Sequence, residues 1–164
     1  MDFSVYLENL EKKLQSCFDI EKNYSYKELE YDMYAEYNVI NARYFMMKSA
    51  KVYSIESNEY CFIKHYEELD AYHLELFINN LKSAVTDFVK PHEDHMSSVI
   101  TGVIVVDQSY SQDLINIIKK FKFHKGFAFG YKGWADIKLV VTTLNTGEVI
   151  TNKKGGDIQK VYQL

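Results

Sequence analysis

Asp107 is an acidic residue whose position in the sequence suits metal chemistry. Carboxylates hold divalent cations, and a bound divalent cation can activate water for hydrolysis. Asp107 directly follows a continuous apolar run, and open α/β sheets bind ligands beyond the carboxyl ends of their strands. A structural role is the favoured interpretation, because Asp107 also fits the start of the turn into the next helix.

A second candidate is a histidine metal site. The segment His92–His95 packs two imidazoles and two carboxylates into four residues, and these are the ligands of zinc, nickel or manganese. The segment follows a proline and is expected in a loop, so His65 or His73 would have to complete the ligand set. A polar connection with incidental histidines is the favoured interpretation, and a metal site at His92 and His95 is the secondary hypothesis.

A third candidate binds anions through lysines that alternate with aromatic residues: Lys119, Lys120, Lys122, Lys125 and Lys132. Trp134, Lys153 and Lys154 add to this basic half of the chain. Lysines beside aromatic rings are typical of proteins that hold phosphates and stack bases. The competing interpretation is that Phe121 continues a helix stripe into the core and that the lysines complement a helix dipole. The overall acidity argues against tight nucleic-acid binding.

Charge is divided unevenly along the chain. Residues 1–97 carry 10 basic and 18 acidic side chains, whereas residues 98–164 carry 9 and 5, and the formal net charge is −4. The two halves could attract each other within one fold or between copies, and a basic face could meet an anionic partner. Solvated charge without a dedicated partner is the simpler interpretation.

Length and composition predict a single domain covering residues 1–164. The 47% hydrophobic and 15% aromatic residues supply its core. Cys17 and Cys61 are far apart in the sequence and are interpreted as buried, reduced thiols of a cytoplasmic protein. No apolar run approaches the roughly 18 residues of a membrane span, and the N-terminus lacks the pattern of a signal peptide. No phosphate-loop motif is present, so no cofactor is expected beyond the divalent metal of the hydrolysis hypothesis.

Apolar spacing predicts three helices. Residues Asp2–Phe18 carry an apolar stripe at intervals of three and four, and Asp70–Val89 carry a wider one with Asp70 as the N-cap. Ser109 and Gln112 fit a capping box that begins the third helix.

Alternation and β-branched residues predict the strands. The run Val99–Val106 reads as a strand buried on both faces, and a tight turn is expected at Ser57–Asn58. Strand, helix and strand from Val99–Val106 to Gly126–Tyr131 imply a right-handed crossover with parallel pairing. The remaining predicted strands are Leu29–Val39, Tyr44–Ser57, Tyr60–Tyr66, Ile137–Thr143 and Glu148–Asn152. The fold class is therefore α/β (α+β): a mixed sheet of about six to seven strands flanked by helices, in the order α-βββ-α-β-α-β-ββ.

This order of elements resembles the restriction-endonuclease-like fold over residues 2–131. Nucleases of that fold hold a divalent metal with carboxylates and carry an acidic-x-lysine motif on a central strand, whose lysine steadies the attacking water or the developing charge. This sequence has Phe62 where the acid should precede Lys64, although Glu56 and Glu59 flank the predicted hairpin and could replace that acid. The resemblance therefore implies metal-dependent hydrolysis of a phosphodiester by Glu56, Glu59, Lys64 and Asp107, and an exposed cross-strand charge is the competing interpretation of Lys64. The C-terminal stretch, Gly133–Trp134 and then residues 136–155, resembles the end of an uncharacterised family of small bacterial and archaeal proteins, which implies no activity.

The sequence favours a non-catalytic binding or interaction module, with metal-dependent phosphodiester hydrolysis as the alternative. The expected partner is an unknown protein or a second copy, bound through a tyrosine-rich surface. Nucleic acid is possible but not favoured, and no membrane partner is expected.

Overall fold

The computed structural model describes residues 1–44 and 51–164, with their side chains except those of residues 40–55. This part of the chain contains three α-helices, α1 (Phe3–Leu14), α2 (Ala71–Phe88) and α3 (Gln112–Lys120). Its seven strands form one sheet: β1 (Asp19–Tyr26), β2 (Leu29–Tyr44), β3 (Lys51–Tyr66), β4 (His95–Val106), β5 (His124–Gly126), β6 (Trp134–Thr143) and β7 (Val149–Thr151). Short 3-10 helices follow β5 and β7: η1 (Ala128–Gly130), η2 (Lys153–Asp157) and η3 (Gln159–Tyr162). The predicted fold class and order of elements are confirmed.

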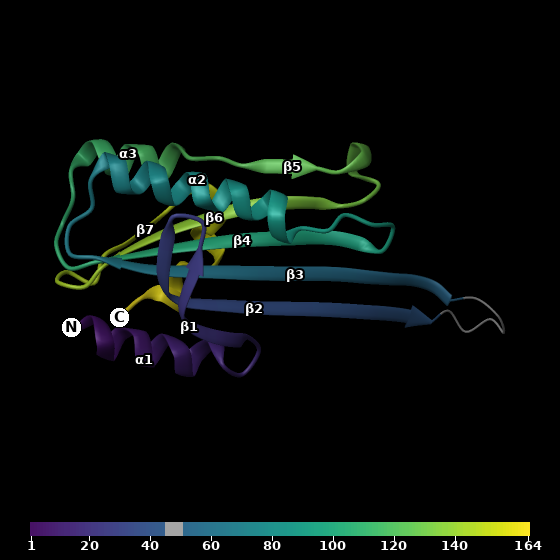
Figure 1. The fold of residues 1–164 in the computed structure, drawn as a ribbon, viewed down its shortest axis with the longest axis horizontal. Coiled ribbons are helices and arrows are strands. Elements are labelled where there is room, and N and C mark those ends of the chain that lie inside the picture. The colour runs from purple at the N-terminus through teal and green to yellow at the C-terminus, as the bar shows by residue number, and fades with distance from the viewer. Residues whose placement is uncertain (45–50) are drawn as a thin grey trace.

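The sheet is mixed, with the order β1-β2-β3-β4-β6-β5 (Figure 1). Strand β4 is parallel to both of its neighbours, β3 and β6, and the other strand pairs among the described residues are antiparallel. Strands β5 and β7 share the outer edge of β6, where β5 pairs with Trp134–Asp136 and β7 pairs with Val140–Thr142. Residues Ile137–Leu139 of β6 therefore lie between the two short strands and pair with neither of them.

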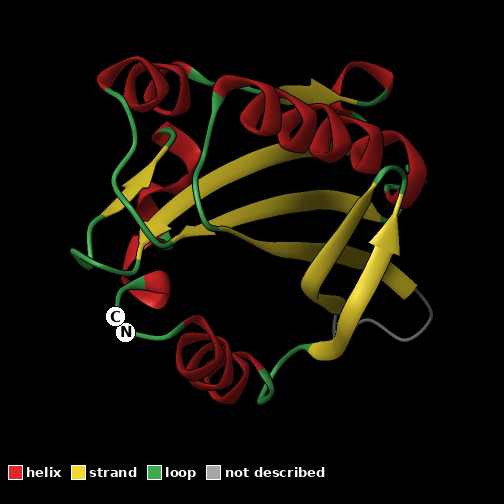
Figure 2. Cartoon of the chain, turned by 60° about the vertical axis from the view of Figure 1, so that its left-hand side comes forward, coloured by secondary structure: helices red, strands yellow, loops and turns green. Residues whose placement is uncertain are grey.

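Helices cover both faces of the sheet (Figures 1 and 2). Helices α2 and α3 bury Phe77, Leu81 and Ile118 against one face, and α1 and η3 bury Leu10 and Tyr162 against the other. Strand β4 lies at the centre, and its residues from Ile100 to Val106 are all buried. The prediction of an interior strand shielded on both faces is thus confirmed.

The three predicted helices are found, although α1 ends at Leu14 and not at Phe18. Asp70 caps α2, and its carboxylate accepts a hydrogen bond from the His73 amide at 2.7 Å. The cap of α3 is Ser111, whose hydroxyl accepts from the Leu114 amide, so the predicted capping box at Ser109 is wrong. Either serine can cap, and only the path of the chain after β4 selects the second.

The predicted turn at Ser57–Asn58 is wrong. Both residues lie inside β3, which runs unbroken from Lys51 to Tyr66 and pairs with β2 and β4 along them. The segment that joins β2 and β3, residues 45–50, which includes part of the predicted strand Tyr44–Ser57, lies outside the described residues. Asn58 favours a turn in isolation, but strands on both sides outweigh that preference.

Strand β1 was not predicted. It forms a hairpin with β2 through Lys27 and Glu28, and Lys27 has a left-handed φ of 53°. The polar sequence of β1 gives weak alternation, and its turn lacks the Asn-Gly signal of a tight hairpin. The Tyr26 hydroxyl donates to Asp87 of α2 at 2.7 Å, so contacts distant in sequence hold this hairpin.

The predicted strand Gly126–Tyr131 is also wrong in part. Strand β5 ends at Gly126 and is antiparallel to β6, and the chain then turns through η1. The parallel partner of β4 is β6. The crossover through α3 therefore exists, but it returns to Trp134–Thr143, with β5 and η1 inserted before it.

Both cysteines are free thiols, as expected, but only Cys61 is buried, because Cys17 is exposed after α1. No helix in the described residues is long and apolar enough to cross a membrane.

Candidate functional site

A cavity of about 650 Å³ opens where β5 and β7 leave the edge of β6 between them. Its walls come from two distant segments of the chain. The first is Phe121–His124, which joins α3 to β5, and the second is η2, which contributes Lys153, Lys154 and Asp157. Aromatic rings and ammonium groups therefore line the same space. A cavity of this size matches those that hold small organic ligands.

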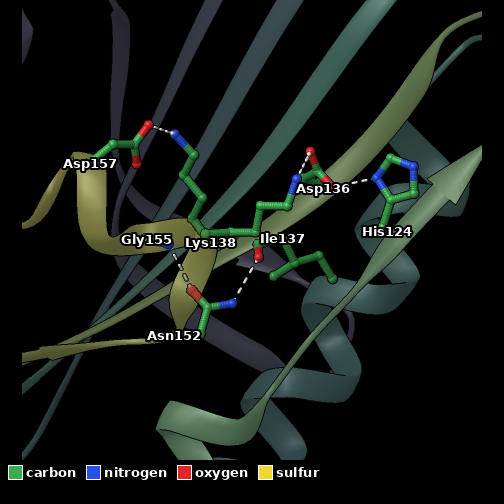
Figure 3. A network of polar contacts seen from close by, with 8 residues as sticks. His124, Asp136, Ile137, Lys138, Asn152, Gly155 and Asp157 are labelled. Atoms are coloured by element: carbon green, nitrogen blue, oxygen red, sulfur yellow. Dashed lines mark hydrogen bonds and ion pairs between the residues drawn. The ribbon is translucent and has the colours of Figure 1, made fainter.

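A buried carboxylate organises the charged side of the cavity. Asp136 of β6 is cross-strand partner to His124 of β5, and its side chain is only 9% exposed. One carboxylate oxygen lies 2.7 Å from Nδ1 of His124, and the other accepts from Nζ of Lys154 at 3.2 Å (Figure 3). Because a buried carboxylate is stable only with partners, Asp136 fixes a residue from each wall.

The side chain of Asn152 joins the two walls. Its carbonyl oxygen accepts from the amides of Leu139 and Gly155, both at 3.0 Å. Its amino group donates to the carbonyl oxygen of Ile137 at 3.0 Å (Figure 3). It also donates to the carbonyl oxygen of Phe121 at 3.4 Å. The amide thus takes the place of a strand along Ile137–Leu139, between β5 and β7, and it holds the end of α3 beside η2.

Two lysines of the cavity are available to a ligand. Lys154 pairs with Asp136, and Asp157 accepts from Lys138 at 2.8 Å. Within the described part of the chain, Lys122 and Lys153 have no ion-pair partner, and both are exposed. Exposed ammonium groups beside aromatic walls favour an anion that carries an apolar part.

The predicted anion-binding lysines do not all converge. Lys122 lines the cavity, as do Lys153 and Lys154. Lys119 and Lys120 end α3 and are exposed, and Lys125 lies over the ring of Phe127 at 5.5 Å. Lys132 lies in the turn before β6, where its carbonyl oxygen contacts Nδ1 of His95 at 2.6 Å.

The four residues of the hydrolysis hypothesis are separated. Glu56 pairs in register with His95 at the start of β4, whereas Asp107 follows the end of that strand, on the order of 40 Å away. Glu56 and Glu59 are three residues apart in β3 and so point to opposite faces. Lys64 donates to the carbonyl oxygen of Glu30 at 2.7 Å. No two of these carboxylates are placed to share one ion.

Glu56 instead belongs to a local polar cluster. Its carboxylate accepts from Asn58 at 2.8 Å and lies 2.5 Å from Nε2 of His92. The hydrogen bond from Asn58, followed by that from His92, lowers the pKa of Glu56 below its usual value. A carboxylate engaged in this way is a structural partner, and His92 provides the second bond.

The ring nitrogens of His92 and His95 are all engaged by protein groups. Nδ1 of His92 accepts from the Asp94 amide at 3.2 Å, and Nε2 faces Glu56. His95 is 3% exposed and contacts the Lys132 carbonyl oxygen and the Ser98 hydroxyl, the latter at 2.8 Å. These residues do not fit a metal, because each lone pair already has a partner. No metal-binding group of three or more such ligands occurs among the described residues.

His65 and His73, the expected supplementary ligands, lie elsewhere. His65 contacts Asp107 at 2.8 Å and stacks on Phe3 with ring centroids 4.2 Å apart. His73 contacts the helix-capping Asp70 at 2.7 Å. Asp107 therefore has a histidine partner at the carboxyl end of β4, beside a cavity of about 350 Å³.

Among the tyrosines whose side chains are described, most are buried or pack against the core, and few contribute to the tyrosine-rich surface expected from the sequence. Buried examples are Tyr6, Tyr31, Tyr34, Tyr60 and Tyr162. In this described set, Tyr72 and Tyr131 are the exposed tyrosines, at 69% and 88%.

Sequence reasoning missed Asp136, His124 and Asn152 as site residues. Asp136 could have been noticed as the single acid near the start of a mostly apolar strand. The role of Asn152 had no comparable signal, because its four bonds join segments that only the folded chain brings together.

Comparison with known proteins gives one match. A family model described as "Domain of unknown function (DUF8052)" matches residues 2–164. No curated protein and no solved structure matches the chain.

Proposed function

This chain belongs to the DUF8052 family, and from its geometry we propose that it is a binding module for a small organic anion that carries a phosphate group. The ligand occupies the cavity between Phe121–His124 and η2. The observation that carries this proposal is the convergence of Lys122, Lys153 and Lys154 on that cavity from two segments far apart in the sequence.

Charge supports an anionic ligand. The carboxylates of Asp136 and Asp157 are each paired with a cation, while Lys122 and Lys153 keep their positive charge for the ligand. Lysine acts on phosphate as a point charge with three donors, so it does not require the fixed geometry of an arginine fork.

The aromatic walls support an organic ligand over a bare ion. Phe121 and Phe123 line the cavity and also pack against the core beneath α2 and α3. Their rings offer an apolar surface to the body of a ligand whose phosphate meets the lysines. The proposed ligand therefore has an organic body and a phosphate group, as a nucleotide or a sugar phosphate does.

Isothermal titration calorimetry at low salt tests the proposal, with ADP and inorganic pyrophosphate as probes. We expect saturable binding of ADP, tighter than that of pyrophosphate because the rings contribute. Lys153→Glu should weaken ADP binding about tenfold or more, since it reverses a charge that faces the ligand. The matched control is Lys119→Glu, an exposed lysine of α3 outside the cavity, which should change binding little.

Two results would overturn this function. One is the absence of binding to either probe at about 5 mM, a concentration that detects even millimolar affinity. The other is an equal loss of affinity in Lys119→Glu and Lys153→Glu, because diffuse charge and not the cavity would then explain binding.

The sequence adds a location and a kind of partner to this proposal. A cytoplasmic location is supported by two free cysteines, and self-association or a protein partner by the opposite charges of the two halves. Metal-dependent phosphodiester hydrolysis on a nuclease-like sheet is the alternative from the sequence; the order of elements supports it, but the separation of Glu56 from Asp107 opposes it. Manganese titration separates it: saturable binding lost in Glu56→Gln or Asp107→Asn would favour hydrolysis.

A further inference from the structure

The turn between β5 and β6 carries two exposed aromatic side chains. Phe129 is 103% exposed and Tyr131 is 88% exposed, the highest values among the large hydrophobic residues described. Single exposed hydrophobic residues are common in proteins. Phe129 and Tyr131 lie close together in one turn, and exposed apolar surface beyond scattered single residues is found at interaction sites.

The backbone of this turn adopts conformations that side chains disfavour. Ala128 and Phe129 have φ values of 48° and 55°, and Gly130 follows with 90°. Only glycine adopts the left-handed region without a steric penalty. A phenylalanine held there while its ring contacts solvent gains no packing in return. Strain retained in this way is found most often at binding sites.

The turn is nevertheless fixed at its base. The Phe127 amide donates to the Gly133 carbonyl oxygen at 2.9 Å, and its own carbonyl oxygen accepts from the Lys132 amide at 3.1 Å. Nδ1 of His95 contacts the Lys132 carbonyl oxygen at 2.6 Å. Gly133 lies so close to β4 that a Cβ there would be 2.3 Å from the Met96 carbonyl oxygen. The rings are therefore presented on a preorganised support, which lowers the entropic cost of binding.

The stretch of chain that carries the turn is basic. Between Asp113 and Asp136 the sequence has five lysines and no acidic residue. Lys125 and Lys132 flank the turn and are exposed. Such a stretch attracts an anionic surface.

We propose that the turn Phe127–Gly133 docks this protein on the surface of an anionic lipid bilayer. Aromatic rings favour the boundary between headgroups and acyl chains, and lysine ammonium groups extend from there to the lipid phosphates. A bilayer closes around a convex tip, whereas a folded partner would need a pocket of matching shape. This partner departs from the sequence-based expectation of no membrane contact, which rested on the lack of a spanning segment.

Co-sedimentation with lipid vesicles tests the proposal. Vesicles of pure phosphatidylcholine are compared with vesicles that contain about one third phosphatidylglycerol. We expect the anionic vesicles to bind at least about tenfold more protein, since each lysine near such a surface contributes roughly fivefold in affinity. High salt should abolish the difference, because it screens the lysines.

Variants of the turn locate the contact. Phe129→Ala combined with Tyr131→Ala should remove most binding, and Lys125→Gln or Lys132→Gln should each weaken it about fivefold. Tyr72→Ala is the matched control, because Tyr72 is another exposed aromatic residue, at 69%, but lies on α2. Its binding should equal that of the unmodified protein.

A glycine variant separates docking from folding. Phe129→Gly removes the ring and relieves the left-handed residue, so we expect an equal or higher melting temperature together with lost vesicle binding. Equal binding to neutral and anionic vesicles would overturn the proposal, as would vesicle binding that the turn variants leave unchanged. Binding of a single-stranded oligonucleotide through the same residues, without vesicle binding, would also overturn it.

Discussion

At the scale of single residues, the cavity depends on two buried polar side chains, Asp136 and Asn152. Each is satisfied by partners from both walls. Buried polar groups are costly when a partner is lost, so these residues hold the cavity together more strongly than their exposed lysine neighbours can.

Replacing Asn152 should destabilise the whole fold. Asn152 is 1% exposed and makes four hydrogen bonds with its side chain. Asn152→Ala leaves backbone groups of Leu139 and Ile137 without partners and should lower the free energy of unfolding by about 3 kcal/mol. Urea denaturation followed by circular dichroism measures this. Gln163→Ala, an exposed amide near the C-terminus, is the control. Equal stability of the two variants would contradict the role given to Asn152.

Glu56 should contribute a pH-dependent part of stability. Hydrogen bonds from Asn58 and His92 lower its pKa in the folded state below the usual 4.5. The stabilisation is therefore present above the unfolded pKa and is lost as the pH falls through the folded pKa. Glu56→Gln should be less stable than the unmodified protein at pH 7, and the difference should shrink towards pH 3. Urea midpoints measured across this range check the prediction, and a difference that grows on acidification would contradict it.

At the residue scale the sequence predicted part of the site. The alternation of lysines with aromatic residues predicted Lys122 as an anion-binding residue, because residue types can be read directly from a sequence. The pairing of Asp136 with His124 was not visible, since it depends on the register of β5 against β6, and that register is set by the turn through η1.

At the scale of elements, two short strands and one side chain share the edge of β6. Strand β5 covers its first residues, β7 its last, and Asn152 the stretch between them. The cavity lies between the segments that flank this stretch, Phe121–His124 and η2. Helix patterns and the buried strand β4 were predictable from periodicity, whereas β1 and β5 were not, because short polar strands are fixed by their neighbours.

The approach of α2 to β4 depends on a glycine. A Cβ at Gly102 would lie 2.3 Å from Cδ1 of Leu81 and 2.6 Å from Cε1 of Phe77. Gly102→Val should push α2 away from the sheet and cost about 2 kcal/mol in the free energy of unfolding. Gly156→Ala is a suitable control, because a Cβ there meets nothing within 4 Å. Thermal unfolding of both variants checks this prediction, and an unchanged melting temperature for Gly102→Val would contradict the packing described.

At the scale of the whole molecule, acidic and basic residues are concentrated in different parts of the fold. The acidic N-terminal part supplies α1, β1, β2 and β3, and the basic part supplies the cavity and the turn at η1. This division was already visible in the sequence. Which lysines face a common space was not, because it requires β7 to return to the edge of β6 and carry η2 to the end of α3.

The proposed cavity is tested most directly by nuclear magnetic resonance. In ¹H–¹⁵N spectra of the protein titrated with ADP, we expect progressive shifts of the backbone amides of Phe121–His124 and Lys153–Gly155 together, saturating at one midpoint. Shifts confined to other residues, or shifts in only one of these two segments, would contradict a ligand held between them.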